Sequence, residues 1–187
     1  MMSHDLVVGG TRMLRGVSLY LVTQGNTVSV IARSQNRLKS LAEKADSLKG
    51  TIHPIQIDYR EGEHLRVKLK KAVDLFGSIS LVVSWIHSAA PEAPSIVADS
   101  VGRESSSFRF FDIWGFLTED PWHVEREKRF LEMEKILYRK ITLGFVIENG
   151  VSRWLTNEEI SSGVIQAIEK DKASFVVGRV EPRSAHP

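Results

Sequence analysis

The sequence predicts an α/β domain in which a doubly wound parallel sheet of six or seven strands lies between two layers of helices. Over the first half of the chain, short apolar and β-branched segments alternate with amphipathic segments of helical period. Such alternation produces parallel strands joined by right-handed crossovers, which place helices on both faces of the sheet. The 187 residues are enough for one domain of this kind and too few for two ordinary ones. We therefore expect a single three-layer domain over residues 1–187, with a flexible tail at residues 181–187.

Strands and helices alternate strictly in this first half. The first strand is the buried segment at residues 6–8, and a tight turn at Gly9 and Gly10 follows it. Further strands are expected where β-branched and apolar residues cluster, at residues 27–32, 52–57 and 79–85. Helices are expected where leucine, valine and alanine recur at helical spacing, at residues 13–23, 35–48 and 61–76. Each helix is followed by a glycine, which favours the position after a helix end.

The second half of the chain is less regular. Pro91 and Pro94 confine a helix within residues 89–101 to the part that follows them. A charged amphipathic helix is expected at residues 123–137. A last helix opens at Thr156, which forms a capping-box pattern with Glu159, and continues to residue 168. Strands are expected where apolar and aromatic residues cluster, at residues 108–114, 141–147 and 175–178.

Composition excludes several classes of site and partner. The absence of cysteine excludes a disulfide framework, a cysteine-based zinc site and a cysteine nucleophile, and it fits the reducing cytoplasm, where we expect the protein. The formal net charge of +2 gives no general affinity for nucleic acid or an anionic membrane. No apolar run approaches the roughly 18 residues of a membrane span. The first residues lack a signal-peptide pattern, and the six histidines lack a metal-binding spacing. We expect no membrane partner and no metal.

Residues 6–16 carry the first sign of a ligand. They combine a short buried strand, a glycine turn and the first turn of a helix. A strand that enters a helix through such a turn leaves backbone N–H groups free at the helix start, and these attract phosphate. A plain strand-to-helix turn without a ligand has the same pattern, so the rest of the chain decides between the two.

Residues 9–16, Gly-Gly-Thr-Arg-Met-Leu-Arg-Gly, resemble the T-G-x-x-x-G-x-G turn of the short-chain dehydrogenase/reductase superfamily, which has an NAD(P)-binding Rossmann fold. Gly10 and Gly16 match the first and last glycines of that turn. Gly9 replaces the threonine, and Leu14 replaces the middle glycine. The resemblance implies that this turn, including Thr11 and Arg12, lies beside the pyrophosphate of a dinucleotide. The side chain of Leu14 stands where the backbone would approach the phosphate.

Three later positions extend the resemblance. Arg33 ends the second strand, where an acidic residue would favour NAD and an arginine favours the 2′-phosphate of NADP. Asp58 follows the third strand, where the superfamily places an aspartate beside the adenine. Ser84-Trp85-Ile86-His87 takes the place of the N-N-A-G stretch. The cofactor-binding set that the resemblance implies is Gly10, Thr11, Arg12, Leu14, Gly16, Arg33, Ser34, Asp58, Tyr59, Ser84 and Trp85. NADP is the cofactor implied first, and NAD the second.

Each of these positions also has an ordinary structural interpretation. Arg12 and Arg33 could converge on a 2′-phosphate, for which the planar guanidinium is suited, or could be plain surface arginines. Asp58 could cap the helix that follows it as well as contact adenine. His87 lies near the expected nicotinamide and could move a proton near neutral pH, although a lone histidine is more often a loop or packing residue.

The catalytic motif of the superfamily, Tyr-x-x-x-Lys with a serine at the end of the fifth strand, is absent. Tyr20, Tyr59 and Tyr138 are followed four residues later by Gln24, Glu63 and Thr142. The fifth strand ends in Asp112-Ile113-Trp114, without a serine. We therefore leave the catalytic residues unassigned and expect an atypical, shortened form with a non-standard or lost catalytic site.

Three functions follow from this resemblance. The first is an NADP(H)-binding oxidoreductase that acts on a small-molecule substrate. The second is a non-catalytic module that senses NADP(H) or binds a protein, and the third is a scaffold that has lost the nucleotide as well. Nucleic acid is not an expected partner, because the basic run at residues 66–71 contains no aromatic residue for stacking. The aromatic residues at 108–122 fit either a core or a subunit interface, which leaves a homo-oligomer open.

Overall fold

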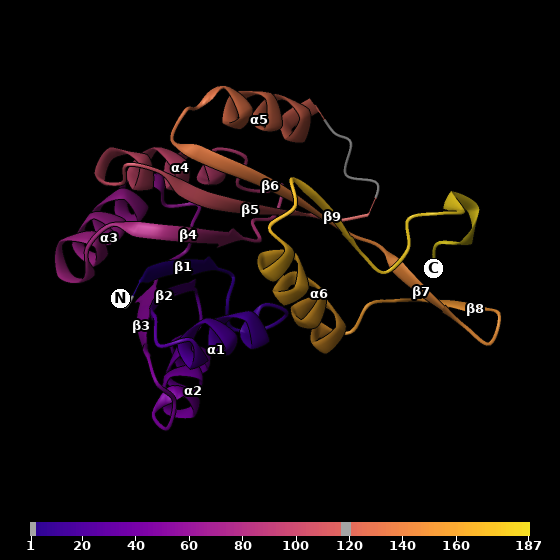
Figure 1. The fold of residues 1–187 in the computed structure, drawn as a ribbon, viewed down its shortest axis with the longest axis horizontal. Coiled ribbons are helices and arrows are strands. Elements are labelled where there is room, and N and C mark those ends of the chain that lie inside the picture. The colour runs from indigo at the N-terminus through magenta and orange to yellow at the C-terminus, as the bar shows by residue number, and fades with distance from the viewer. Residues whose placement is uncertain (1–2, 117–120) are drawn as a thin grey trace.

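A computed structural model describes residues 3–116 and 121–187, and within them seven parallel strands form the central sheet. The order across the sheet is β3-β2-β1-β4-β5-β6-β9, and helices cover both faces (Figure 1). The predicted doubly wound α/β fold is confirmed, with the larger of the two expected numbers of strands. The strands are β1 (His4–Val8), β2 (Thr27–Ala32), β3 (Thr51–Gln56), β4 (Ile79–Ser84), β5 (Phe108–Trp114), β6 (Ile136–Leu143) and β9 (Ser174–Val177).

Two apolar clusters, one on each face of the sheet, hold the helices in place. Helices α1, α2 and α6 pack on one face, and helices α3, α4 and α5 pack on the other (Figure 1). No helix of the described residues is long and apolar enough to cross a membrane. The helices are α1 (Arg15–Thr23), α2 (Gln35–Ala45), α3 (Gly62–Phe76), α4 (Ala93–Glu104), α5 (Pro121–Glu132), α6 (Asn157–Lys170) and the short 3-10 helix η1 (Arg183–Ala185).

The winding of the sheet reverses between β1 and β4. From β1 the sheet extends through β2 to β3 on one side, whereas β4, the next strand in the sequence, pairs with the other side of β1. In open α/β sheets, ligands bind in the crevice outside the carboxyl ends of the strands at such a reversal. The carboxyl ends of β1, β2 and β4 are therefore the place where a site is expected.

The elements after β5 differ most from the predicted ones. The predicted helix 123–137 is wrong at its end, because α5 stops at Glu132 and β6 begins at Ile136. Ile136 and Tyr138 face inward while Leu137 faces solvent, which is the period of a strand. The predicted strand 141–147 is also wrong, since it is divided at Gly144. There the backbone N–H of Gly144 donates to Val177, and the chain leaves the sheet.

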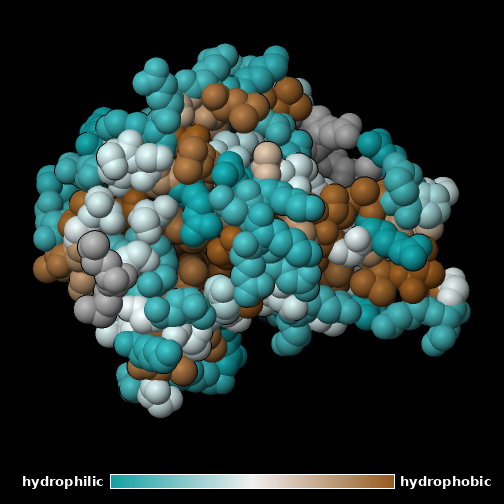
Figure 2. All heavy atoms as spheres, viewed as in Figure 1, coloured by the Kyte–Doolittle hydropathy of each residue, from teal (hydrophilic) through white to brown (hydrophobic). Residues whose placement is uncertain are grey.

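An antiparallel hairpin follows this division. Strand β7 (Phe145–Glu148) pairs with β8 (Val151–Trp154) through Asn149 and Gly150, both of which have positive φ. Tight two-residue hairpins demand that conformation, and Asn-Gly is the sequence that supplies it best. On the face shown in Figure 2, hydrophobic residues gather at the end of the molecule where this hairpin lies. The tail returns there, because the ring of His186 lies 5.5 Å from that of Phe116 and 6.5 Å from that of Trp154.

Gly10, which follows β1, allows α1 to pack tightly on the sheet. A Cβ atom on Gly10 would lie 2.6 Å from the hydroxyl of Ser18 and within 2.9 Å of Val7 and Val30. We expect Gly10→Ala to lower the free energy of unfolding by about 1–3 kcal/mol, because overpacking of a filled core costs that much. Urea denaturation measures the change.

Gly102→Ala in α4 is the control for this substitution. Its Cβ would meet only Phe108, at the ordinary distance of 3.7 Å. Because alanine is the better helix former, we expect Gly102→Ala to leave stability unchanged or to raise it by up to about 1 kcal/mol. Equal stability of the two variants would contradict the tight packing at Gly10.

Candidate functional site

A cavity of about 720 Å³ lies at the carboxyl ends of β1, β2 and β4. The glycine turn after β1, the end of β2 and the segment after β4 all contribute to its wall. Six residues that the sequence predicts for cofactor binding line it, namely Thr11, Arg12, Arg33, Ser34, Tyr59 and Trp85. The structure thus brings together, at the reversal of the sheet, residues that lie up to 74 positions apart in the chain, from Thr11 to Trp85.

The lining of this cavity is positively charged and partly aromatic. Arg12, Arg33 and Arg37 contribute guanidinium groups, and no aspartate or glutamate is among the described residues that line it. Tyr59 and Trp85 contribute flat apolar surfaces. Guanidinium groups bind phosphate through paired hydrogen bonds, and aromatic rings stack on planar groups. The cavity therefore suits a ligand that carries both phosphate and a planar ring.

Two further cavities adjoin this one along the same edge of the sheet. A cavity of about 560 Å³, which Asp58 and Gln56 help to line, shares Arg33 with it. On the other side, a cavity of about 450 Å³ between α1 and α6 shares Thr11 and Arg12. The three cavities adjoin as a groove, with an arginine at each junction and with the carboxylates of Asp58, Glu61 and Glu158 in the two outer cavities.

Ser34 and Arg37 place the start of α2 at this groove. The hydroxyl of Ser34 caps the helix by accepting a hydrogen bond of 3.4 Å from the backbone N–H of Arg37. The amino end of a helix carries a partial positive charge, which adds to the charge of Arg33 and Arg37. Arg37, which the sequence analysis missed, lies one helical turn after Ser34 and faces the same cavity. Helical spacing from Ser34 is the signal that could have indicated it.

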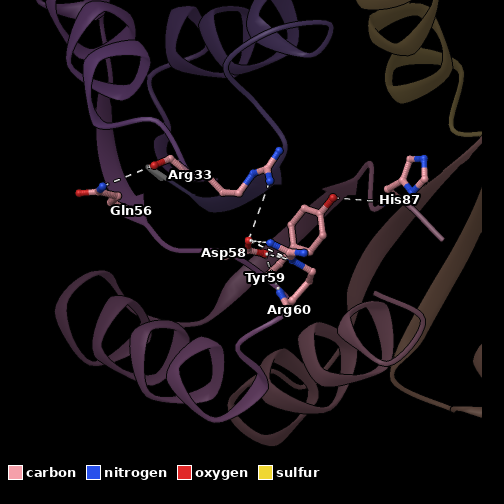
Figure 3. Close-up of polar contacts among 6 residues, drawn as sticks. All are labelled: Arg33, Gln56, Asp58, Tyr59, Arg60 and His87. Atoms are coloured by element: carbon pink, nitrogen blue, oxygen red, sulfur yellow. Dashed lines mark hydrogen bonds and ion pairs between the residues drawn. The ribbon is translucent and has the colours of Figure 1, made fainter. Parts of the chain in front are cut away.

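Asp58 does not line the main cavity, and arginines hold its carboxylate. The carboxylate accepts hydrogen bonds of 2.6 to 3.1 Å from the guanidinium of Arg60, and it lies 3.9 Å from that of Arg33 (Figure 3). It also accepts a bond of 3.0 Å from the backbone N–H of Arg60. The hydrogen bonds from Arg60 lower the pKa of Asp58 to about 2, so the carboxylate stays ionised at every physiological pH. Arg60 is a second residue that the sequence analysis missed.

Tyr59 spans from this arginine cluster to the segment after β4 (Figure 3). Its hydroxyl accepts a hydrogen bond of 3.4 Å from the backbone N–H of His87, which also lines the main cavity. The Nδ1 atom of His87 accepts from the backbone N–H of Ala89 at 3.2 Å, so the neutral ring carries its proton on Nε2. A phenol hydroxyl and an imidazole ring thus stand at this wall of the cavity.

The glycine turn is built differently from the pattern that it resembles. Gly9 has a φ of +81°, and its backbone lies against Trp85. Gly10 is buried under the turn. Leu14 is fully buried in the cluster beneath α1, so its side chain points away from the groove. The turn therefore runs to residue 14, and α1 begins at Arg15, two residues later than predicted.

Gly16 and Ser161 join α1 to α6 at the start of α1. The backbone N–H of Gly16 donates to the hydroxyl of Ser161 at 3.1 Å, and that hydroxyl donates to the carbonyl of Met13 at 2.7 Å. The N–H of Arg15 donates to the carbonyl of Arg12. Two backbone amides at the start of α1, those of Arg15 and Gly16, thus have partners inside the protein. The side chain of Arg12 is a further donor beside the turn.

Ser84, the last residue of β4, and Asp112, its neighbour on β5, do not line the main cavity. Ser84 is fully buried, pairs in register with Asp112, and its hydroxyl has no hydrogen-bond partner among the described residues. Asp112 accepts from the indole N–H of Trp114 at 2.9 Å, from the hydroxyl of Tyr138 at 3.1 Å and from Arg126 at 2.9 Å. Burial and the adjacent Asp112 carboxylate raise the pKa of Tyr138 well above its usual range. Tyr138 is therefore neutral and a hydrogen-bond donor.

Comparisons with known proteins bear on the fold. No protein-family model matches the chain, and no curated protein resembles it significantly in sequence. Solved structures do match. A short-chain type dehydrogenase/reductase of Mycobacterium marinum has a TM-score of 0.76 at 16% identity, covering 94% of this chain and 93% of that one. An alcohol dehydrogenase of the archaeon Thermococcus sibiricus, complexed with 5-hydroxy-NADP, has a TM-score of 0.75 at 14% identity, covering 96% of each chain.

A third match carries a different cofactor. A short-chain dehydrogenase/reductase of Burkholderia phymatum in complex with NAD has a TM-score of 0.74 at 8% identity, covering 94% of this chain and 89% of that one. Identities this low show a shared fold and leave the chemistry of each protein its own. The agreement nevertheless extends over nearly the whole chain. The protein has the Rossmann fold of the short-chain dehydrogenase/reductase structures.

Proposed function

We propose that this protein binds NADP(H) in the groove at the carboxyl ends of β1, β2 and β4. The observation that carries the proposal is the cluster of Arg12, Arg33 and Arg37 around a cavity whose described lining residues include no aspartate or glutamate, at the reversal of the sheet. The structural neighbours that hold 5-hydroxy-NADP and NAD support a nicotinamide dinucleotide as the ligand class. The arginines favour the form with a 2′-phosphate.

Each part of the ligand has a matching part of the groove. Thr11 and Arg12 lie at the glycine turn and would bind the pyrophosphate. Arg33, Ser34 and Arg37 lie at the end of β2 and would bind the 2′-phosphate, helped by the amino end of α2. Trp85 and Tyr59 would pack against the sugar and ring systems. When bound, the nicotinamide supplies the hydride chemistry.

The catalytic part of the proposal is a non-standard or lost site. In the superfamily that the sequence resembles, a serine stands at the end of β5, and here that position belongs to the buried cluster of Asp112, Arg126 and Tyr138. Tyr59 and His87 are the described proton-carrying groups at the main cavity. A second candidate function is a non-catalytic NADP(H) sensor, which the internal bonding of Asp112 and Tyr138 favours.

Titration with NADPH and NADH tests the binding. We expect NADPH to bind at least about tenfold more tightly than NADH, because charge-assisted hydrogen bonds to the additional phosphate contribute about 1.5–3 kcal/mol. Quenching of tryptophan fluorescence reports the event, since Trp85 lines the cavity. If neither dinucleotide binds at millimolar concentration, the proposal is wrong and the scaffold function remains.

Turnover separates the two candidate functions. The oxidoreductase predicts that NADPH absorbance falls when aldehydes, ketones or quinones are added. The sensor predicts a flat absorbance with every substrate, although NADPH binds. The oligomeric state, measured with and without NADPH, is a further test of the sensor. A ligand can change the assembly only if it binds the two oligomeric states with different affinity.

A further inference from the structure

One carboxylate, that of Asp58, contacts two arginines beside the 560 Å³ cavity, and one of them, Arg33, also lines the main cavity. The Oδ2 atom of Asp58 lies 2.6 Å from one terminal nitrogen of Arg60 and 3.9 Å from a terminal nitrogen of Arg33. The Oδ1 atom accepts from both the side-chain Nε and the backbone N–H of Arg60, at 3.1 and 3.0 Å. Both oxygens of Asp58 are therefore occupied by Arg60, and the same carboxylate draws Arg33 toward it (Figure 3).

The three side chains differ in their exposure. Asp58 is 17% exposed, whereas Arg33 is 71% exposed and Arg60 is 59% exposed. The carboxylate thus lies underneath, and the guanidinium groups reach outward. Arg33 lines both the 720 Å³ and the 560 Å³ cavities. Arg60 is not among the residues that line these cavities, and its guanidinium lies beside them through its contact with Asp58, which lines the smaller one.

We propose that Asp58 is a positioning residue, which holds Arg33 and Arg60 together as a paired site for the 2′-phosphate and does not itself contact the adenine. This assignment rests on the NADP(H) site proposed above. It departs from the role that the sequence resemblance implies for Asp58, and it adds Arg60 to the residues that select the cofactor.

The physical reason is the repulsion between two guanidinium groups. Two like charges a few Å apart repel each other, and a carboxylate between them removes most of that cost. Arg60 is held by several hydrogen bonds, so little conformational freedom is left for it to lose when a ligand binds. Because hydrogen bonds from Arg60 keep the pKa of Asp58 at about 2, no pH used in a binding assay releases the pair.

Asp58→Asn tests this assignment, since it removes the charge and keeps the shape. We expect NADPH to bind roughly tenfold more weakly, because the geometry of a charge-assisted contact to phosphate is lost, while NADH affinity stays unchanged. Calorimetric titration of wild type and variant with both dinucleotides measures the change. Asp99→Asn is the matched control, because Asp99 pairs with Arg129 across α4 and α5, outside the described cavities, and both affinities should stay unchanged.

Three results would overturn the assignment. Equal weakening of NADPH and NADH would indicate a contact with adenine. Tighter binding of NADPH would show that Asp58 competes with the phosphate for the arginines. No change would show that Asp58 has no part in binding. If wild type binds neither dinucleotide, both the proposed function and this assignment are wrong. If wild type binds NADPH and the Asp58→Asn variant shows no selective loss, only this assignment is wrong.

A second variant guards against a failure to fold. Arg60→Met removes one member of the pair and leaves the backbone N–H that caps Asp58. It should also weaken NADPH selectively, and circular dichroism checks that each variant is folded. If Arg60→Met binds NADPH as tightly as wild type does, Arg60 is not part of the phosphate site and the proposal is wrong.

Discussion

Replacement of Arg33 by alanine is expected to weaken NADPH binding roughly ten- to a hundredfold and to leave NADH binding nearly unchanged. Arg33 is the arginine at the end of β2 that lines both the main cavity and its neighbour. Hydrogen bonds between charged partners contribute about 1.5–3 kcal/mol, which gives that range of affinity. Since the side chain is 71% exposed, the loss should lie toward the lower end in high salt. Calorimetry with the two dinucleotides measures the difference.

Two variants control this experiment. Arg33→Lys keeps the charge but loses the planar fork, so we expect an intermediate loss of NADPH affinity. Arg103→Ala removes an exposed arginine of α4 that lies outside the described cavities, and it should change neither the NADPH affinity nor the NADH affinity. An equal loss of NADPH and NADH affinity in Arg33→Ala would place Arg33 at the pyrophosphate or the ribose and would contradict the proposal that it selects the 2′-phosphate.

The sheet could be predicted from the sequence because its signal is local. The segments 27–32 and 108–114 consist of β-branched, apolar and aromatic residues, and β2 and β5 have those bounds. Interior strands of a parallel sheet are buried on both faces, so they appear as short, nearly continuous apolar runs. The ends of α5 and β6 were not predictable in this way, because the charged segment before residue 136 fits a helix, and only the alternation of Ile136, Leu137 and Tyr138 indicates the strand.

The hairpin of β7 and β8 has a local signal in the sequence. Asn149-Gly150 lies between two short segments of apolar character, which is a strong pattern for a tight turn. The prediction of one strand at residues 141–147 follows instead from their apolar character, which is typical of a single continuous strand. After Gly144 the chain leaves the sheet, and Phe145 forms an antiparallel bridge with Arg179, which follows α6 and β9 in the sequence. Such a contact leaves no trace in the neighbouring residues.

The site was predictable where position along a strand determines it. Thr11, Arg33, Tyr59 and Trp85 follow strand ends, and parallel strands bring those ends to one edge. The partners of these residues were not predictable. The hydroxyl of Ser161 accepts a hydrogen bond from Gly16 at the start of α1, although the two residues are 145 positions apart in the chain. Arg60 donates to the carboxylate of Asp58 because of a side-chain conformation that no sequence spacing encodes. Long-range capping and side-chain pairing depend on the folded arrangement rather than on a repeat in the chain.

Arg126→Met is expected to have the largest effect on stability, lowering the free energy of unfolding by about 3–5 kcal/mol. The guanidinium of Arg126 donates to both oxygens of Asp112, and the two side chains are only 8% and 3% exposed. Removal of one partner leaves a buried carboxylate without its counter-charge, which is costly, whereas removal of an exposed pair costs at most about 1 kcal/mol. Arg129→Met supplies that comparison. Arg129 lies on α5, as Arg126 does, and pairs at the surface with Asp99 of α4, where the two side chains are 48% and 30% exposed.

These two substitutions also separate structure from chemistry at the end of β5. If the cluster around Asp112 only fills the core, the folded Arg126→Met variant should bind NADPH as tightly as wild type does. The loss of stability should then be seen only in denaturant unfolding. If Asp112 and Arg126 act on a bound ligand, NADPH affinity or turnover should fall by more than the unfolded fraction explains. A stability loss no larger than that of Arg129→Met would contradict the buried pair. The internal bonding of Asp112 to Trp114 and Tyr138 favours the first outcome, since groups that already satisfy one another have little left for a substrate.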